Sequence, residues 1–129
     1  MKRSVIIAVV ILLAVSATAQ QYEINIKLNN NDIENLRTAL LSDNEGLRKS
    51  GVYFSGLYKV EELAGELIKI LDSDNKENIR IAAAYSLYQM NIDESINVIR
   101  KASTENTNSR VRRICNALYS HFVSVHTLL

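Results

Sequence analysis

The amino-acid sequence repeats itself about every 31 residues. Three short acidic turn sequences mark the period, each with a hydroxyl residue, an acidic residue and an asparagine in succession: Ser42-Asp43-Asn44, Ser73-Asp74-Asn75 and Thr104-Glu105-Asn106. A period of this length is typical of arrays in which one supersecondary unit stacks on the next. Such a unit cannot bury its apolar face alone, so the repeat restricts the fold to a row of similar units.

Apolar residues inside each unit keep the spacing of a helix. Before the first turn, Leu36 and Leu40 stand four residues apart, and their counterparts in the other units do the same. After each turn the offset becomes 32 residues, and the pattern runs through positions i, i+3, i+4, i+7 and i+11. The second pattern comprises Leu47, Ser50-Gly51, Phe54 and Tyr58, then Ile79, Ala82-Ala83, Ser86 and Met90, then Val111, Ile114-Cys115, Leu118 and Phe122. Each unit is therefore predicted to be a helix pair.

These patterns predict an all-α fold of about six helices, over residues 31–41, 45–58, 60–72, 77–90, 93–102 and 108–125. Asp43, Asp74 and Glu105 stand just before the second helix of each pair. A carboxylate there accepts backbone N–H bonds and faces the positive end of the helix dipole. Small residues are expected to let adjacent helices approach closely at Ser50, Gly51, Ala82, Ala83 and Ser86.

The combination of features resembles HEAT-type α-solenoid repeats, in their short bacterial version. It consists of the period, the two helices per unit, the acidic turn, and an aliphatic residue followed by arginine at Leu47-Arg48, Ile79-Arg80 and Val111-Arg112. The resemblance covers residues 32–122 and implies a short right-handed α-solenoid of antiparallel helix pairs. It also implies a structural ladder that ties turns to helices, formed by Asp43, Arg48, Asp74, Arg80, Glu105 and Arg112. The chain departs from the family in having no proline and in having Gly51 where alanine is usual.

Residues 1–19 have the three-part layout of a secretory signal peptide. Lys2 and Arg3 precede an apolar run over residues 4–17, and Ala17 and Ala19 are the small residues of a cleavage site. The run is shorter than the roughly 20 residues that a membrane-spanning helix needs. We therefore expect cleavage near Ala19-Gln20 and export to the periplasm or the medium, without stable insertion in a membrane. Cleavage leaves 13 of the 15 basic residues against 14 acidic ones, a formal charge of −1.

Residues 20–30 are expected to form an extended arm that precedes a HEAT-like helical domain over residues 31–129. Tyr22, Ile24, Ile26 and Leu28 alternate with polar residues, which is the period of a strand. Two hypotheses account for the arm. It straps across the exposed apolar face of the first helix as a cap, or it adds to a strand of a partner protein. The cap is preferred, because terminal repeats need their outer faces covered.

Residues that could carry chemistry have simpler interpretations in this chain. His121 and His126 are five residues apart, so on a helix they point to different sides, whereas metal pairs favour a spacing of three or four. Cys115 belongs to an apolar stripe and is expected to be a small buried hydrophobe. The sequence therefore predicts no catalytic, cofactor-binding or metal-binding residue, and we expect the chain not to be an enzyme.

Without catalytic, cofactor-binding or metal-binding residues, the surface of the fold is the remaining candidate for a functional site. Near-neutral charge and export argue against nucleic acid as a partner. Helix-pair arrays present a face for binding, and we expect there a protein-binding patch of Glu66, Lys69, Asn97, Arg100 and Lys101. The sequence thus predicts a non-catalytic, exported protein–protein interaction module or scaffold that uses no cofactor and binds a protein partner.

Two alternative functions follow from other features. One is a self-assembling structural element of the cell envelope, a homo-oligomer, because Tyr119 and Val123 give the last helix an apolar outer side that no following repeat covers. The other is a lyase-like enzyme, which only the resemblance suggests, since some HEAT-like proteins are lyases that attach bilin chromophores. The interaction module is preferred over both.

Overall fold

The computed structural model describes residues 26–128. The expected signal peptide and the arm as far as residue 25 lie outside the described residues. Within that range the chain forms six α-helices and one short 3-10 helix, and no strand. The predicted all-α class is confirmed for this range. The helices are α2 (Asn30–Leu40), α3 (Glu45–Leu57), α4 (Ala64–Ser73), α5 (Glu77–Met90), α6 (Asp93–Glu105) and α7 (Ser109–Thr127), with the 3-10 helix η1 (Glu61–Leu63) before α4.

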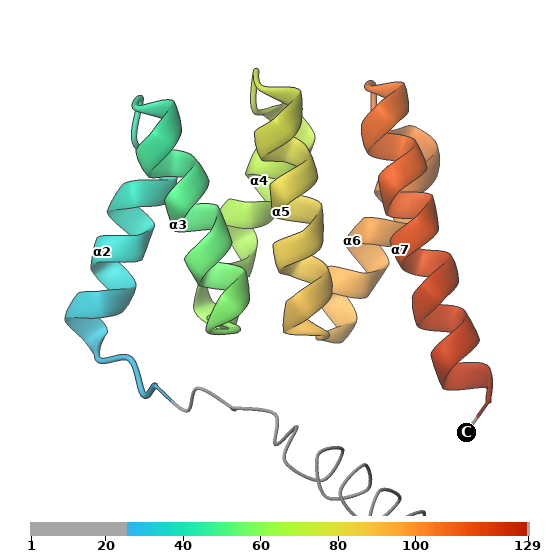
Figure 1. Cartoon of the computed structure of the whole chain (residues 1–129), viewed down its shortest axis with the longest axis horizontal. Coiled ribbons are helices and arrows are strands. Elements are labelled where there is room, and N and C mark those ends of the chain that lie inside the picture. Colours follow the sequence, from blue (N-terminus) through green and yellow to red (C-terminus); the bar gives the residue numbers. More distant parts are fainter. Residues whose placement is uncertain (1–25, 129) are drawn as a thin grey trace, which may run out of the picture.

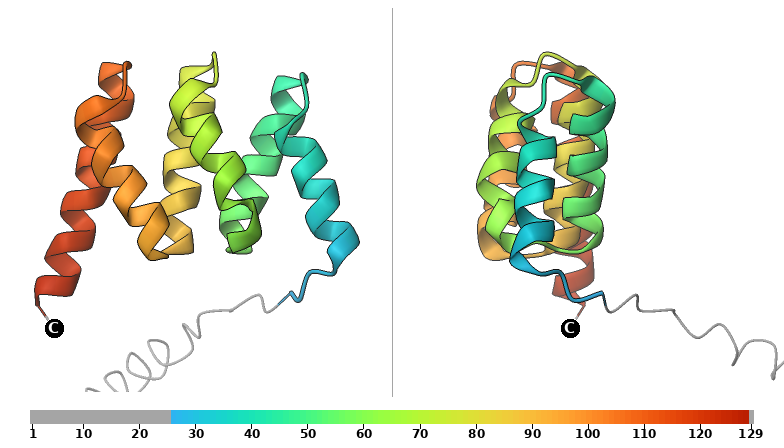
Figure 2. Two further views of the ribbon diagram at one scale, coloured as in Figure 1. Left: turned by 180° about the vertical axis from the view of Figure 1, so that it is seen from behind. Right: turned by 90° about the vertical axis from the view of Figure 1, so that its left-hand side faces the viewer.

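The helices lie in a row that is two layers deep (Figure 1). The two helices of each pair pack against each other, so α2 contacts α3, α4 contacts α5 and α6 contacts α7. One layer holds α3, α5 and α7, and the other holds α2, α4 and α6 (Figure 2). Successive pairs meet mainly through α3 against α5, and through α5 against both α6 and α7. Pair α2–α3 therefore ends the row on one side and pair α6–α7 ends it on the other.

The predicted helix boundaries agree with the structure to within four residues. The largest difference is at α4, which begins at Ala64 rather than at residue 60 because the 3-10 helix η1 precedes it; α6 continues to Glu105 rather than ending at residue 102. The repeat is also visible in the backbone, because Lys59 after α3 and Asn91 after α5 both have left-handed φ angles, 51° and 53°. These two residues are 32 positions apart and each follows the last turn of a second helix. Such a residue commonly ends a helix.

The core is a continuous apolar cluster that runs through the whole row. It contains most of the apolar residues that the helical stripes predicted, and Leu67, Ile79, Leu87, Val111 and Cys115 are all fully buried. Each pair contributes side chains to a cluster shared with its neighbours. At roughly 25 cal/mol per Å² of apolar surface removed from water, this shared burial is the main stabilisation of the fold.

The turns before the second helices differ from the sequence prediction. Asn44 caps α3 by accepting the backbone N–H of Leu47 at 3.0 Å. Asn108 caps α7 in the same way. The carboxylates predicted to do this, Asp43, Asp74 and Glu105, are not the caps, because each precedes the N-cap position of its helix.

The register of the turns explains this difference. One residue in each turn accepts the backbone N–H of the residue two positions later, and these acceptors are Ser42 Oγ, Asp74 Oδ1 and Asn106 Oδ1. They are separated by 32 residues, not 31. Asp43 and Glu105, which the sequence alignment matched to Asp74, are therefore each one residue away from the acceptor of their own turn.

The joint between the first and second pairs depends on a glycine. A Cβ atom on Gly56 would lie 2.6 Å from the Cα, Cβ and Oγ atoms of Ser86. The Ser86 hydroxyl donates a hydrogen bond of 2.7 Å to the carbonyl oxygen of Val52. Helices α3 and α5 thus approach through small residues on both sides, as the sequence predicted for Ser86.

Candidate functional site

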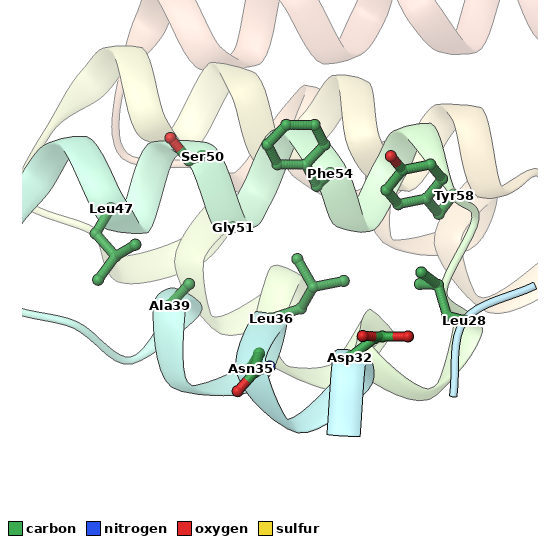
Figure 3. A pocket seen from close by; sticks show the side chains of 10 residues that line it. All are labelled: Leu28, Asp32, Asn35, Leu36, Ala39, Leu47, Ser50, Gly51, Phe54 and Tyr58. Atoms are coloured by element: carbon green, nitrogen blue, oxygen red, sulfur yellow. The ribbon is translucent and has the colours of Figure 1, made fainter. Parts of the chain in front are cut away.

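An apolar groove runs between α2 and α3, the first two helices of the row (Figure 3). Its volume is about 370 Å³. It is lined from α2 by Asp32, Asn35, Leu36 and Ala39, from α3 by Leu47, Ser50, Gly51 and Phe54, and at one end by Tyr58 and Leu28. We refer to this surface as the α2–α3 groove.

The α3 wall of the groove is the apolar stripe that the sequence predicted for every second helix. In α5 the same repeat positions are covered, and Ile79 and Ser86 are 0% and 3% exposed. In α3 they are open, and Leu47 and Phe54 are 49% and 39% exposed. The difference follows from position in the row, because α3 packs on α5 whereas no helix of the described chain packs on this side of α3.

Aromatic stacking gives the groove a defined wall. The rings of Phe54 and Tyr58 are stacked, with centroids 5.9 Å apart and planes at 11°. Tyr53 meets Phe54 edge to face, with centroids 5.2 Å apart. These contacts restrict the orientation of Phe54, so the exposed face of its ring is presented to the groove in one preferred position.

The arm reaches the groove at one end only within the described residues. Leu28 packs against the core and lies beside Tyr58 (Figure 3). Two residues earlier, Ile26 is 52% exposed. The predicted strap by Tyr22 and Ile24 lies outside the described residues.

Polar groups at the groove rim are already engaged by backbone. The Asp32 carboxylate accepts the N–H of Asn29 at 2.9 Å and completes the capping box of α2. The Ser50 hydroxyl donates to the carbonyl oxygen of Gly46 at 2.9 Å. The groove therefore offers mainly apolar surface, which suits the side chains of a protein partner better than a small charged ligand.

Arginine side chains join successive turns. Arg48 Nε donates to Asp74 Oδ2 at 2.6 Å, and Arg80 Nη2 donates to Asn106 Oδ1 at 2.5 Å. In both cases the acceptor is 26 residues further along the chain. The hydrogen bond to Asp74 raises the pKa of Arg48 above its ordinary value. These bonds fix one pair against the next.

The last arginine of this series differs from the others. Arg112 Nη1 donates to the carbonyl oxygens of Asn106 and Thr107 in its own turn, at 2.6 and 3.2 Å. Within residues 26–128 its hydrogen bonds stay in its own turn, whereas those of Arg48 and Arg80 reach the next turn. Of the two remaining residues predicted for the ladder, Glu105 faces Lys101 at 3.8 Å on the surface, and Asp43 is exposed.

A second polar cluster joins α5 to the turn before α7. Glu77 accepts hydrogen bonds from Asn108 Nδ2 at 2.8 Å and from Arg110 Nη1 at 2.9 Å. These two bonds lower the pKa of the Glu77 carboxyl below its ordinary value. Neither the cluster nor its residues had been singled out as a contact from the sequence.

The predicted protein-binding patch is divided between two hollows. Glu66 and Lys69 line a hollow between α2 and α4, and Glu66 is paired with Arg37 of α2. Asn97, Arg100 and Lys101 line another hollow, between α6 and α7. The structure therefore does not unite the five residues in one pocket, and Glu66 already serves an ion pair between two helices.

The residues considered for chemistry have separate structural partners. Burial raises the pKa of the Cys115 thiol to about 11, which keeps it protonated at neutral pH. His121 Nδ1 lies 2.5 Å from the Tyr88 hydroxyl, and His126 Nδ1 lies 2.9 Å from the carbonyl oxygen of Phe122. Among residues 26–128 there is no group of three or more His, Cys, Asp or Glu side chains that could hold a metal ion.

The α2–α3 groove was not singled out from the sequence, although Leu36, Leu47, Phe54 and Tyr58 of its lining were in the predicted stripes. The available signal was the order of the units, because α2–α3 is the first of the pairs that the structure describes and no described pair lies before it to cover its outer face. Within the described part of the chain, no helix has both the length and the apolar character that crossing a membrane requires. Comparisons with protein-family models, with curated proteins and with solved structures found no match.

Proposed function

We propose that this chain is a small exported, non-catalytic protein-interaction module, and that a protein binds in its α2–α3 groove. In this proposal the helix row is a short right-handed α-solenoid of antiparallel pairs of the HEAT type. The pairwise contacts of α2 with α3, α4 with α5 and α6 with α7, and the 32-residue register of the turns, support this arrangement.

The observation that carries the proposal is the contrast between the first pair and the second. The stripe of α5 is buried beneath α3, and its Ser86 bonds directly to the backbone of α3. The stripe of α3 has the same repeat positions, but Leu47 and Phe54 stay about half exposed. Exposed apolar patches bounded by polar residues mark interaction sites on soluble proteins.

Site-specific photocrosslinking in the producing cells tests the proposal. A benzophenone amino acid replaces Phe54 in the groove, and a matched variant carries it in place of Tyr85, which is 47% exposed on α5. We expect a discrete protein adduct from position 54 and none from position 85. The groove variant Ser50→Arg should abolish the adduct, because a long charged side chain then fills the hollow.

A third crosslinking position separates this proposal from the patch predicted from the sequence. Arg100 lines the hollow between α6 and α7, at the other end of the row. Adducts from position 100 with none from position 54 would place the binding site on the patch and refute the groove. Equal adducts from positions 54 and 85 would indicate non-specific contact and would count against the proposal as well.

A further inference from the structure

The occupant of the α2–α3 groove can be inferred from how the chain fills the equivalent surfaces inside itself. Helix α3 lies on the second pair, and α5 lies on the third pair. Each time, the helix that is donated is the second helix of the preceding unit. Among residues 26–128, the first pair is the one that no such helix covers, and α7 is the one second helix on which no following pair packs. This inference rests on the proposed function and names the partner that it leaves open.

Repeat register identifies the surface of α7 that corresponds to the donated surface of α3. Gly56 of α3 meets Ser86 of α5, and 64 residues after Gly56 the chain has Ser120. Ser120 is exposed on α7, and Val123 beside it is 41% exposed. The outer side of α7 is therefore accessible at the positions that α3 uses in the internal joint.

The side-chain sizes at the two free ends are compatible. In the internal joint, a glycine faces a serine and the helices approach closely. If α7 of a second copy took the place of the missing helix, Ser120 would face the position of Phe54. A small residue opposite a large one leaves room for ordinary helix packing, since interaxial distances follow the side chains at the contact.

The arginine series gives an independent indication of the same partner. Arg48 and Arg80 each bind the turn of the following unit, through Asp74 and Asn106. Within the part of the chain that the structure describes, Arg112 binds carbonyl oxygens of its own turn and no following turn. In a second copy the equivalent of those two acceptors is Ser42.

The surroundings of Ser42 also suit an arginine. Ser42 has the turn geometry of its counterparts, because its Oγ accepts the N–H of Asn44. Exposed Asp43 stands beside it and offers a carboxylate to the incoming guanidinium.

Charge also favours the contact of unlike ends. Pair α6–α7 carries Arg100, Lys101, Arg110, Arg112 and Arg113 against Asp93, Glu94 and Glu105, a formal surplus of two positive charges. Pair α2–α3 carries four acidic residues against three basic ones. Opposite net charges favour the approach of one end to the other and disfavour contact of like ends.

We propose that the α2–α3 groove binds helix α7 of a second copy of this chain, head to tail, so that the helix row continues from one molecule into the next. Such an interface joins two different surfaces and leaves a free groove and a free α7 on every assembly. It therefore adds copies without a fixed end point, unlike a two-fold dimer. Asn116 and Ser120 make the α7 surface polar enough to stay solvated, so the association is reversible.

Two matched variants test the interface without entering the core. Ser50→Arg blocks the groove, and Ser120→Arg blocks the outer side of α7; both serines are exposed. Ser73→Arg is the control, since Ser73 is exposed at the end of α4 and lines neither surface. The full chain is expressed with its own N-terminal segment, purified after export, and examined by sedimentation equilibrium from about 1 μM to 1 mM, a range that covers weak protein interfaces.

We expect the mean mass of the wild type and of Ser73→Arg to rise continuously with concentration. Ser50→Arg and Ser120→Arg should each remain at the mass of one chain, with unchanged helical circular dichroism. An equimolar mixture of these two variants should give a complex of two chains and nothing larger, because one variant keeps an intact groove and the other an intact α7. This mixing result is specific to a head-to-tail contact.

Other occupants give different results. A wild type that stays monomeric over the whole range overturns the proposal. If position 54 then crosslinks to a different protein, the proposed function stands and only the second copy is wrong; if it crosslinks to nothing, both are wrong. A plateau at two chains that Ser50→Arg alone abolishes indicates groove-to-groove pairing and also overturns the proposal. Capping by the chain's own arm is indicated by a monomer that begins to associate when Tyr22 and Ile24 are replaced by serine, and it too excludes the second copy as the native occupant.

Discussion

The first helix pair and the second have the same design but different surroundings. Position for position, Leu47 of α3 corresponds to Ile79 of α5, and the leucine is 49% exposed whereas the isoleucine is 0% exposed. The same apolar pattern therefore produces a core surface in one unit and an open groove in the other. In a repeat array the burial of a residue is determined by its neighbouring units as well as by its own helix.

The first pair is nevertheless more than an unpaired copy of the second. Where α5 has Ser86, α3 has Phe54, a large aromatic that stacks on Tyr58. Ser86 allows the close approach of α3, whereas Phe54 fills space beside its own pair. The free end therefore has a large aromatic side chain where the joint inside the row has a serine, so a helix bound there would lie at a greater distance.

The largest effect on stability should come from placing a large side chain in the close contact between α3 and α5. Gly56→Leu places a side chain where even a Cβ atom lies 2.6 Å from Ser86. We expect the variant to lose more than about 4 kcal/mol of unfolding free energy, because overpacking must displace helix backbone as well as side chains. Urea unfolding followed by circular dichroism measures this loss.

A second glycine provides the control for this variant. Gly65 lies in the first turn of α4, and a Cβ atom there would meet nothing within 4 Å. Gly65→Ala should raise the unfolding free energy by about 0.5–1 kcal/mol, because alanine has the higher helix propensity. If Gly56→Leu were tolerated as well as Gly65→Ala, the close α3–α5 joint would be wrong.

The next largest effect concerns the ion pair that fixes the first pair on the second. The side chains of Arg48 and Asp74 are only 13% and 6% exposed. Asp74→Ala leaves this arginine without its partner and removes the acceptor of the Lys76 N–H. We expect a loss of about 3 kcal/mol, since removal of one member leaves a poorly solvated charge.

The surface carboxylate predicted for the same ladder supplies the comparison. Glu105 pairs with Lys101 at 3.8 Å, and both side chains are more than half exposed. Glu105→Ala should change the unfolding free energy by less than about 0.5 kcal/mol. Equal losses for the two variants in thermal unfolding would contradict the 32-residue register of the turns.

Much of this fold could be predicted because helix spacing and period are local properties of the sequence. The helices, their boundaries and most core residues follow from the stripes at Leu67, Ile79 and Val111. The capping residues could not be assigned by aligning the turns at a spacing of 31 residues. The equivalent residues of the turns are 32 apart, and the extra residue of each unit lies within the turn itself. The ion pairs of Arg37 and Arg48 join residues 29 and 26 positions apart, and only the packing of pairs determines which charges meet.

The groove illustrates the same limit from the functional side. Leu47 and Phe54 were correctly placed on an apolar stripe, yet a stripe alone does not say whether it is covered. The predicted patch of Glu66 and Lys101 relied on a shared surface, whereas the structure puts these residues in different hollows. Exposure depends on which unit stands next in the row, and that is a property of the assembled fold.

Truncation of equivalent side chains in the first and second pairs should cost different amounts of unfolding free energy. Ile79→Ala removes a fully buried side chain and should cost about 2–3 kcal/mol of unfolding free energy. Leu47→Ala removes a half-exposed side chain and should cost less than about 1 kcal/mol in dilute solution. Chemical unfolding at two protein concentrations measures both values.

This pair of variants also sharpens the difference between an empty groove and an occupied one. If a second copy covers Leu47, the cost of Leu47→Ala should rise with protein concentration, since binding to the folded state stabilises it by mass action. The cost of Ile79→Ala should not change. A large, concentration-independent cost for Leu47→Ala would mean that the groove is covered within a single chain.

The smallest effect on stability should come from Ser42→Asp, which gives the first turn the carboxylate that Asp74 gives the second. The serine hydroxyl already accepts the N–H of Asn44, and within the described residues the first turn has no arginine from a preceding unit. We therefore expect a change below about 0.5 kcal/mol in the unfolding free energy of the dilute chain.

At high concentration, Arg112 of a second copy can bind the new carboxylate of the Ser42→Asp variant as Arg48 binds Asp74. Sedimentation equilibrium should then show association tightened by up to about tenfold, equivalent to about 1.4 kcal/mol. Adding Arg112→Gln should remove this gain, and a gain that persists in the double variant would mean that the arginine series does not extend from one molecule to the next.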